Sequence, residues 1–574
     1  MTRTLRNPIL GGFYPDPSIC RVDGDFYLVN STFAYFPGIP VFHSRDLCHW
    51  LQIGNAIDRP GQICFDGHQI SQGLFAPTIR HNRGTFYILC TLIHTGGNFI
   101  ITAKDPAGPW SDPVWLDGAD GIDPSIFFDD DNSAWYMGTH PAPEGEAYPG
   151  NYEIYIQQMD LSPLGKGEEL TTEYTEFGGE GKEVRAGKNL LIGEKFGIWR
   201  GALRGAIWPE GPHIYRINGW YYLLHAEGGT GLDHAVCVAR ARDIRGPWEG
   251  KKSNPVLTHR HLGKNAAIIN VGHADLVDDP AGNWWMVLLA SRTVNGVCPL
   301  GRETFMVPVF WEDGWPFVAS KTGLIEEEID LKFITQRHED AQKKNFVPWR
   351  LGVKSSRKEC DRFDGKLPLH WLTLRMPARE QNAAISLTAR PGVLRLFTTA
   401  ATMRGRDHPA FAGRRLNHHT WAFSAAIAFT PQAACETAGI MLLQSEDWHY
   451  RFELFRADSG VPALRLIRAA GSADEEVIAA GECPAAARSP RNTVILAARC
   501  EGTTLSFWYG NGRRAAPGSF PALKRFADGV DGRILSSEYA GGFVGTLAGV
   551  FASGNGSGSG NYADVFWAEY EGTR

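Results

Sequence analysis

Long apolar runs are missing from this sequence. No stretch of about 18 apolar residues, the length that a membrane-spanning helix needs, occurs anywhere in its 574 residues. The N-terminal segment MTRTLRNPILGG also lacks the apolar core of a secretory signal. We therefore expect a cytoplasmic protein that makes no contact with a membrane.

Excess charge of one sign and metal-binding cysteine motifs are scarce as well. The chain has 57 Lys and Arg against 63 Asp and Glu, a net charge of -6, which gives it no electrostatic attraction for nucleic acid. Its ten cysteines form no CxxC pair, and a chain of this size does not need disulfides to hold a core. A neutral ligand such as a sugar suits this composition better.

A repeated pattern is what the sequence has in abundance. A polar or Pro-containing step, an apolar pair and a turn rich in Asp, Asn and Gly lead to an aromatic pair. The five copies are DPSICRVDGDFYLV from Asp16, APTIRHNRGTFYIL from Ala76, DPSIFFDDDNSAWYMG from Asp123, EGPHIYRINGWYYLL from Glu210 and HADLVDDPAGNWWMVL from His273. Two strands joined by a tight turn give this spacing, so each copy predicts a β-hairpin.

Three further segments that resemble one another follow some of the copies. HSRDLCHW at 43–50, TAKDPAGPW at 102–110 and RARDIRGPW at 240–248 resemble one another, and we expect them to form the outer strand of the unit. Helical periodicity is almost absent, and units of about 50–60 residues with several strands each are typical of propeller blades. The sequence therefore predicts an all-β, five-bladed propeller.

The first residue of each repeat is expected at the mouth of the innermost strand of its blade, beside the central axis. Four of these five residues are ionisable, namely Asp16, Asp123, Glu210 and His273. Like charges at short range oppose one another, so stability does not explain their gathering there. We expect a functional site at the axis.

The character of the chain changes beyond about residue 320. We predict the propeller over 1–325, with the polar segment 161–189 as an exposed insertion, and a charged connector over 326–355. Short alternating stretches, from GVLRLFT to TTLSFWYG, recur within 356–574. Regular spacing with alternation indicates an antiparallel β-sandwich as the second domain.

Seven motifs in order along the chain carry a resemblance to a known family. They are NPILGGFYPDPSICR, STFAYFPGIPVFHSRDLCHW, GIDPSIFFDDD, WPEGPHIY, LLHAEGGTG, VGHADLV and PLGRETF. The chain resembles glycoside hydrolase family 43, in particular its β-xylosidase and α-L-arabinofuranosidase branch. That resemblance covers the whole chain and implies a five-bladed propeller followed by a concanavalin-like sandwich.

The resemblance also implies three catalytic carboxylates. Asp16 is expected to be the general base, Glu210 the general acid, and Asp123 the residue that tunes and orients the acid, because inverting hydrolysis needs both a proton donor and a base for water. Glu210 must stay protonated near neutral pH. The charges of Asp16 and Asp123, with apolar walls from Trp208 and Pro209, are expected to raise its pKa. Each acid taken alone could equally cap a turn.

A histidine and an arginine are implied next to these acids. The resemblance places His273 under the sugar, associated with a divalent ion such as calcium or with a water, and makes Arg302 a hydrogen-bond donor to the terminal sugar. The alternatives are a satisfied core histidine and a structural salt bridge. A single histidine without companion ligands does not by itself define a metal site.

Aromatic rings are expected to form the walls, because the C–H faces of pentoses pack on them. Phe33 matches a family position that lines the terminal-sugar pocket. Phe75 stands where xylosidase relatives commonly have Trp, a change that widens the pocket or favours arabinofuranose. Phe543 is expected to reach over the pocket from the sandwich. Asp564, in the last predicted strand, is a candidate ligand of a structural calcium or a surface acid.

These features together predict an exo-acting, inverting pentosidase without an organic cofactor. Its substrates would be xylo-oligosaccharides or arabinoxylan fragments. Two alternatives stay open, a non-catalytic carbohydrate-binding propeller with a lectin-like sandwich and an endo-acting arabinanase. The sequence does not separate β-D-xylose from α-L-arabinofuranose, although Phe75 favours substantial arabinofuranosidase activity. Enzymes of this branch often form dimers or tetramers, so a homo-oligomer also stays open.

Overall fold

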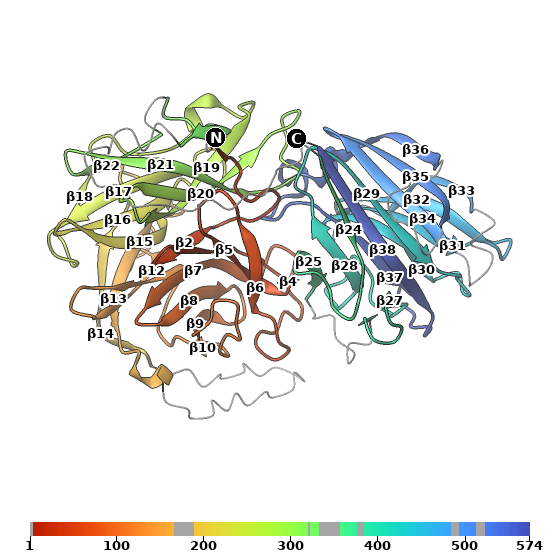
Figure 1. Ribbon diagram of the computed structural model, residues 1–574, viewed down its shortest axis with the longest axis horizontal. Helices are drawn as coiled ribbons and strands as arrows, with labels where there is room; N and C mark the ends of the chain where they lie inside the picture. Colours follow the sequence, from red (N-terminus) through yellow and green to blue (C-terminus); the bar gives the residue numbers. More distant parts are fainter. Residues whose placement is uncertain are drawn as a thin grey trace.

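Five four-stranded sheets are arranged around an axis in the first part of the chain (Figure 1). The computed structural model describes residues 4–165, 189–319, 322–331, 356–375, 384–483, 493–512 and 523–573. Most of the predicted insertion (166–188) and most of the predicted connector (332–355) therefore lie outside the described residues. The all-β propeller predicted from the five repeats is confirmed.

Each blade begins with one of the predicted hairpins and adds two further antiparallel strands. The blades are, in chain order, β2 (Ser18–Val22), β3 (Asp25–Val29), β5 (Gly38–Ser44) and β6 (Leu51–Ile57); β7 (Leu74–Asn82), β8 (Thr85–Leu92), β9 (Gly97–Ala103) and β10 (Val114–Trp115); β11 (Ile122–Phe128), β12 (Ala134–Pro141), β13 (Tyr152–Met159) and β14 (Leu191–Trp199); β15 (Glu210–Ile217), β16 (Trp220–Glu227), β17 (Ala235–Ala241) and β18 (Glu249–Gly250); and β19 (Ile268–Asp278), β20 (Trp284–Arg292), β21 (Glu303–Glu312) and β22 (Trp315–Val318). The first strands of neighbouring blades contact one another around the ring.

The prediction of outer strands at 43–50, 102–110 and 240–248 is wrong. Each of these segments covers the end of the third strand of a blade and the turn that follows it, and the outer strands β6, β10 and β18 begin later. The aspartate that the three segments share caps that turn. Asp46, Asp105 and Asp243 each accept a backbone N–H two residues further on, at 3.0, 2.9 and 2.9 Å. The similarity of the three segments therefore reflects a repeated Asx turn.

Apolar side chains fill the gaps between blades. One buried cluster lies in each gap, and the cluster that closes the ring joins Leu28 and Phe42 of the first blade to Val287 and Met306 of the fifth. The N-terminal strand β1 (Thr4–Arg6) pairs with β23 (Glu328–Asp330), which is the described part of the predicted connector. These clusters hold the first strands, and with them the axial residues, in place.

Two eight-stranded sheets form the second domain and enclose its apolar core. Their strands are β24 (Ser356–Asp361), β25 (Trp371–Leu374), β26 (Ile385–Ser386), β27 (Leu394–Phe397), β28 (Ala410–Arg415), β29 (Thr420–Ala428), β30 (Thr437–Ser445), β31 (Trp448–Arg456), β32 (Pro462–Ala470), β33 (Glu476–Glu482), β34 (Thr493–Glu501), β35 (Thr504–Gly512), β36 (Lys524–Asp531), β37 (Leu547–Ser553) and β38 (Tyr562–Thr573). The predicted antiparallel sandwich is confirmed.

Helices are short and few in the described residues. They are the 3₁₀-helices Ser162–Gly165, Arg260–Leu262 and Gly532–Leu535 and the α-helix α2 (Ser537–Ala540). None of them is long and apolar enough to cross a membrane.

The sandwich packs against the propeller beside the axis (Figure 1). Strand β4 (Tyr35–Phe36) of the propeller pairs with β25 and completes one sheet of the sandwich. A buried cluster joins Phe13 and Phe33 of the propeller to Phe411 and Phe551 of that sheet. This sheet therefore packs against apolar residues on both of its faces. For this reason β30 is buried along almost its whole length, instead of alternating between buried and exposed residues.

Candidate active site

The axial residues adopt a backbone conformation that side-chain-bearing residues rarely use. Asp16, Ala76, Asp123 and His273 have φ angles of 52°, 36°, 54° and 46°. Register shifts interrupt the pairing of β7, β11 and β19 with the second strands of their blades around these positions. A bulge of this kind bends a strand and redirects a side chain, and it is common beside active sites.

Glu210 does not share the register that the repeats predict. The residue of the fourth blade with the equivalent left-handed backbone is Gly211, with φ 57°, and Glu210 precedes it. A Cβ atom at position 211 would lie 2.9 Å from the ring of His273, so only glycine leaves room for that ring. The prediction that the three acids occupy equivalent positions is thus wrong for Glu210, which enters the site one residue earlier in its strand.

Asp16 is a buried carboxylate that lies against a cation. Its Oδ1 accepts a hydrogen bond from Arg302 Nη1 at 3.0 Å, and its Oδ2 accepts one from the Ser31 hydroxyl at 2.6 Å. Burial by itself would raise the pKa of Asp16, but the opposing effects, of which the Arg302 guanidinium is the largest and the Ser31 hydrogen bond another, together lower the pKa below its ordinary value. Asp16 is therefore ionised at neutral pH, as a base must be.

The pKa values of Asp123 and Glu210 are raised, whereas that of Asp16 is lowered. Burial and the Asp16 carboxylate raise the pKa of Glu210 to about 7. Burial, Glu210 and Asp16 raise the pKa of Asp123, while the backbone N–H of Gly211 donates to its carboxylate. Since three close carboxylates face a single arginine, the site retains a proton near neutral pH. That bond to Gly211 also ties Asp123 to the residue next to Glu210.

His273 lies in the same cluster and is uncharged. It is buried, and its Nδ1 is 4.0 Å from Asp123 Oδ2. Burial lowers the pKa of His273 below its ordinary value. Calcium takes about six to eight oxygen ligands. Within the described ranges, no group of three or more His, Cys, Asp or Glu ligand atoms converges at His273, so these residues do not fit direct calcium binding.

Three phenylalanine rings cluster with Arg302 next to Asp16; that of Phe33 is fully buried, and those of Phe75 and Phe543 are partly buried. The ring of Phe33 is 5.3 Å from that of Phe75 and 6.1 Å from that of Phe543. The guanidinium of Arg302 lies 5.3 Å from the Phe543 ring, and its Nη2 donates to the Phe543 carbonyl at 3.4 Å. The structure thus brings together all three phenylalanines predicted from sequence, although Phe543 comes from the sandwich domain.

Trp208 and Pro209, the apolar walls expected for Glu210, differ in their exposure. Pro209 is buried, but the indole of Trp208 is 38% exposed. A Cβ atom added at Gly150 or Gly229 would lie 2.9 or 2.8 Å from the indole, so both glycines let the ring lie close against the backbone. Trp208 N–H also donates to the Gly150 carbonyl at 2.8 Å. Trp208 is therefore a fixed, solvent-facing ring two residues from Glu210.

A second group of axial residues lies near these acids and was not predicted. Asp275 is fully buried and receives two hydrogen bonds from Arg80, at 2.7 and 3.0 Å, and one from the Ser18 hydroxyl at 2.7 Å. Tyr215 donates to the same carboxylate. Burial alone would raise the pKa of Asp275, but Arg80, His213 and Tyr215 together outweigh it and lower that pKa. Ser18, Arg80, Tyr215 and Asp275 lie two to five positions after the first residue of their repeats. This regular placement could have identified them from the sequence.

Asp564 does not lie near the axis. It belongs to β38 in the sandwich, where its two oxygens accept from Arg390 at 2.6 Å and from Arg395 at 2.8 and 3.1 Å. Two guanidinium groups balance the charge of this one carboxylate. This geometry argues against the calcium expected from the sequence, because a dication would face two positive charges.

Two models of known protein families match the chain. Residues 5–316 match the model of glycosyl hydrolases family 43, and residues 360–571 match the model of the beta-xylosidase C-terminal concanavalin A-like domain. The chain belongs to glycoside hydrolase family 43. As a family-43 member it is a glycosidase, and the axial carboxylates occupy its catalytic domain.

Relatives of this family-43 glycosidase match along its whole length. A xylosidase/arabinosidase of Butyrivibrio fibrisolvens is 40% identical and covers 98% of this chain and 99% of its own. The non-reducing end α-L-arabinofuranosidase BoGH43B of Bacteroides ovatus is 36% identical over 99% and 95%. A solved structure described as xylan β-1,4-xylosidase from Bacillus halodurans has a TM-score of 0.81 at 28% identity, over 99% of both chains.

Proposed function

We propose that this glycosidase is an exo-acting, inverting enzyme that removes terminal β-D-xylose and α-L-arabinofuranose from xylo-oligosaccharides or arabinoxylan fragments. The observation that carries the proposal is the opposite pKa shift of two axial acids, the buried Asp16 and the partly buried Glu210. Asp16 is held ionised by Arg302, whereas Glu210 keeps its proton up to about pH 7. An acid and a base with separated pKa values are what glycoside hydrolysis by inversion requires. The names of the relatives support the choice of pentoses.

The reaction then proceeds in one displacement. Asp16 accepts a proton from a water molecule as the water oxygen attacks the anomeric carbon. Glu210 donates its proton to the glycosidic oxygen, and the bond between that oxygen and the anomeric carbon breaks. Asp123, through its bond with the N–H of Gly211, positions the backbone beside Glu210. Proton exchange with solvent returns both groups to their starting states.

The second domain supports exo rather than endo action. Phe543 of the sandwich donates its N–H to Ser71 at 2.9 Å and accepts from Arg302, so it bounds the site beside Asp16. An endo-acting arabinanase needs a passage that is open on both sides of the scissile bond. A wall supplied by another domain suits the end of a sugar chain, and for this reason we favour removal of single terminal residues.

Turnover of model pentosides tests the proposal. Both p-nitrophenyl β-D-xylopyranoside and p-nitrophenyl α-L-arabinofuranoside should be hydrolysed, and a proton NMR time course should show the inverted anomer first. Comparison of the two kcat/KM values gives the preferred sugar. Binding of these pentosides without turnover would instead indicate a lectin-like protein, and first release of the retained anomer would contradict the roles given to Asp16 and Glu210.

Trp208 is expected to stack against the sugar that follows the scissile bond. Its ring is solvent-facing and lies two residues from the proposed acid. Stacking of a sugar on an indole is worth about 1 kcal/mol, so Trp208→Ala should raise KM for a pentose disaccharide roughly 5-fold. Steady-state kinetics on the disaccharide and on the corresponding glycosyl fluoride would show this. The fluoride has a one-atom leaving group, and its KM should not change.

Two further variants separate stacking from a general disturbance of the loop. Trp208→Phe keeps an aromatic face and should restore most of the affinity for the disaccharide. Leu203→Ala changes an exposed apolar residue of the same segment, 47% exposed, and should leave both substrates unaffected. Equal losses on disaccharide and fluoride would show that Trp208 acts on the catalytic acid rather than on the leaving sugar.

A further inference from the structure

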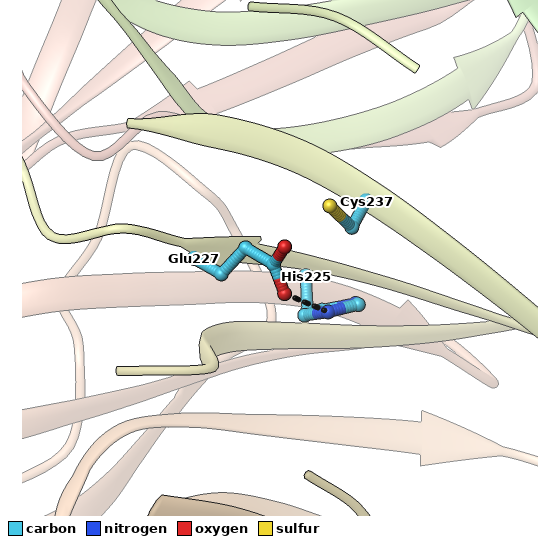
Figure 2. Close-up of side chains that lie close together, drawn as sticks. All are labelled: His225, Glu227 and Cys237. Atoms are coloured by element: carbon cyan, nitrogen blue, oxygen red, sulfur yellow. Dashed lines mark ion pairs between the residues drawn. The ribbon is translucent and has the colours of Figure 1, made fainter. Parts of the chain in front are cut away.

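Three potential metal ligands lie on one face of the fourth blade (Figure 2). His225 and Glu227 are two residues apart in β16, so their side chains point to the same side of the sheet. Cys237 in β17 is the direct cross-strand partner of His225 and shares that side. In the described part of the chain, they are the only group of three or more His, Cys, Asp or Glu residues whose ligand atoms converge, all within 4.8 Å of one another.

The spacing of the group suits an ion better than a direct bond. His225 Nε2 and Glu227 Oε2 are 3.6 Å apart, which is longer than a hydrogen bond. Two ligands on a tetrahedral zinc ion, each about 2.0–2.2 Å from the metal, lie roughly 3.3–3.5 Å apart. The side chains of His225 and Cys237 are fully buried and that of Glu227 is nearly so, so these residues are held in place by the surrounding blade.

Glu227 interacts with both His225 and the Cys237 thiol, and the group has further partners outside it. The Trp199 indole donates to His225 Nε2 at 3.3 Å, and the Ala202 N–H donates to Glu227 Oε2 at 2.9 Å. Nδ1 of the buried His225 ring has no partner. Because Nε2 accepts the Trp199 proton, Nδ1 of the neutral ring carries the other hydrogen, so an ion would bind at Nε2 in place of the Trp199 bond. None of these groups takes part in the hydrolysis proposed above.

We propose that His225, Glu227 and Cys237 bind a thiophilic divalent cation of the zinc type between the third and fourth blades. Thiolate, imidazole and carboxylate are all ligands of zinc, whereas calcium and magnesium prefer oxygen alone. On binding, the metal–sulfur bond replaces the S–H bond of Cys237, and the proton passes to solvent. The thiolate and the Glu227 carboxylate then balance the two positive charges, so the buried site is neutral, with a fourth position for water.

The cobalt-substituted full-length protein tests this site directly. Co²⁺ is a spectroscopic substitute for Zn²⁺, and a cobalt–thiolate bond gives a near-ultraviolet charge-transfer absorption that oxygen and nitrogen ligands do not give. Wild-type protein titrated with Co²⁺ should develop this absorption to an end point of one ion per chain. One equivalent of Zn²⁺ should abolish it. Saturating Zn²⁺ should also raise Tm by about 5 °C, because the ion binds the folded state only.

A matched pair of cysteine variants assigns the absorption. Cys237→Ser should lose it, whereas Cys435→Ser, at a half-buried free thiol in the sandwich, should keep it. X-ray absorption at the zinc edge of wild-type protein needs no variant and should show one sulfur at about 2.3 Å with nitrogen and oxygen at about 2.0–2.2 Å. Only nitrogen and oxygen neighbours, or an unchanged cobalt spectrum in Cys237→Ser, would overturn the proposal.

Discussion

Replacing Glu210 with Gln is expected to lower kcat for hydrolysis of a pentose disaccharide by roughly 10³-fold, the usual contribution of a general acid. The glutamine amide fills the same volume but has no acidic proton to give to the glycosidic oxygen. Ground-state contacts change little, so the dissociation constant of the disaccharide should stay within about 3-fold of the wild-type value. Single-turnover kinetics and calorimetric binding measure the two effects separately.

The pH profile of this variant provides a second, independent signature. In the wild type, Glu210 must be protonated and Asp16 ionised, so kcat/KM should fall above about pH 7, where Glu210 loses its proton. It should also fall at acidic pH, below the ordinary carboxyl range, because the pKa of Asp16 is lowered. In Glu210→Gln only the acidic fall should remain, since no proton is left to lose near neutrality.

Two comparisons distinguish loss of an acid from loss of structure. Glu194→Gln makes the same change at an exposed position of β14 and should leave both kcat and the pH profile unchanged. Aryl pentosides with leaving groups of decreasing pKa should recover activity in Glu210→Gln, because a better leaving group needs less protonation. A uniform loss across that series would show that Glu210 has another role.

The hairpin pattern predicts the blades because it has a local cause. Each repeat contains its own turn residues and its own aromatic pair, so a stretch of about 15 residues determines how its two strands pair. The axial placement of Asp16, Asp123 and His273 follows from the same pattern. The assignment of Glu210 as the general acid rests instead on the resemblance of the motif WPEGPH to the family, since its position in the repeat is shifted by one residue relative to Gly211.

Contacts between distant segments could not be predicted in this way. The left-handed backbone of Asp16, Asp123 and His273 costs about 1–2 kcal/mol per residue, so contacts with the rest of the fold must stabilise it. Phe543 reaches Arg302 only because the sandwich sheet, extended by β4, packs on the propeller. Nothing in either local sequence specifies that distance.

A substitution that breaks the ion pair of Asp275 and Arg80 should strongly destabilise the propeller. We expect Asp275→Asn to lower the free energy of unfolding by about 3–5 kcal/mol, because it leaves the Arg80 guanidinium as a buried charge without its partner. The side chain of Asp275 is completely buried and that of Arg80 is 16% exposed, so water cannot replace the lost contact. Equilibrium urea unfolding, monitored by tryptophan fluorescence, measures the change.

Asp278 in the same strand is the matched control for this prediction. It pairs with Arg21 at 2.8 Å, but its side chain is 39% exposed, so Asp278→Asn should cost at most about 1 kcal/mol. A double-mutant cycle then isolates the charge effect. If the unpaired guanidinium causes the loss in Asp275→Asn, adding Arg80→Met should recover part of it, and the two single effects should sum to more than the double. Additive losses would instead assign the stability to the hydrogen bonds of Asp275 with Ser18 and Tyr215, which join the first and fourth blades to the fifth.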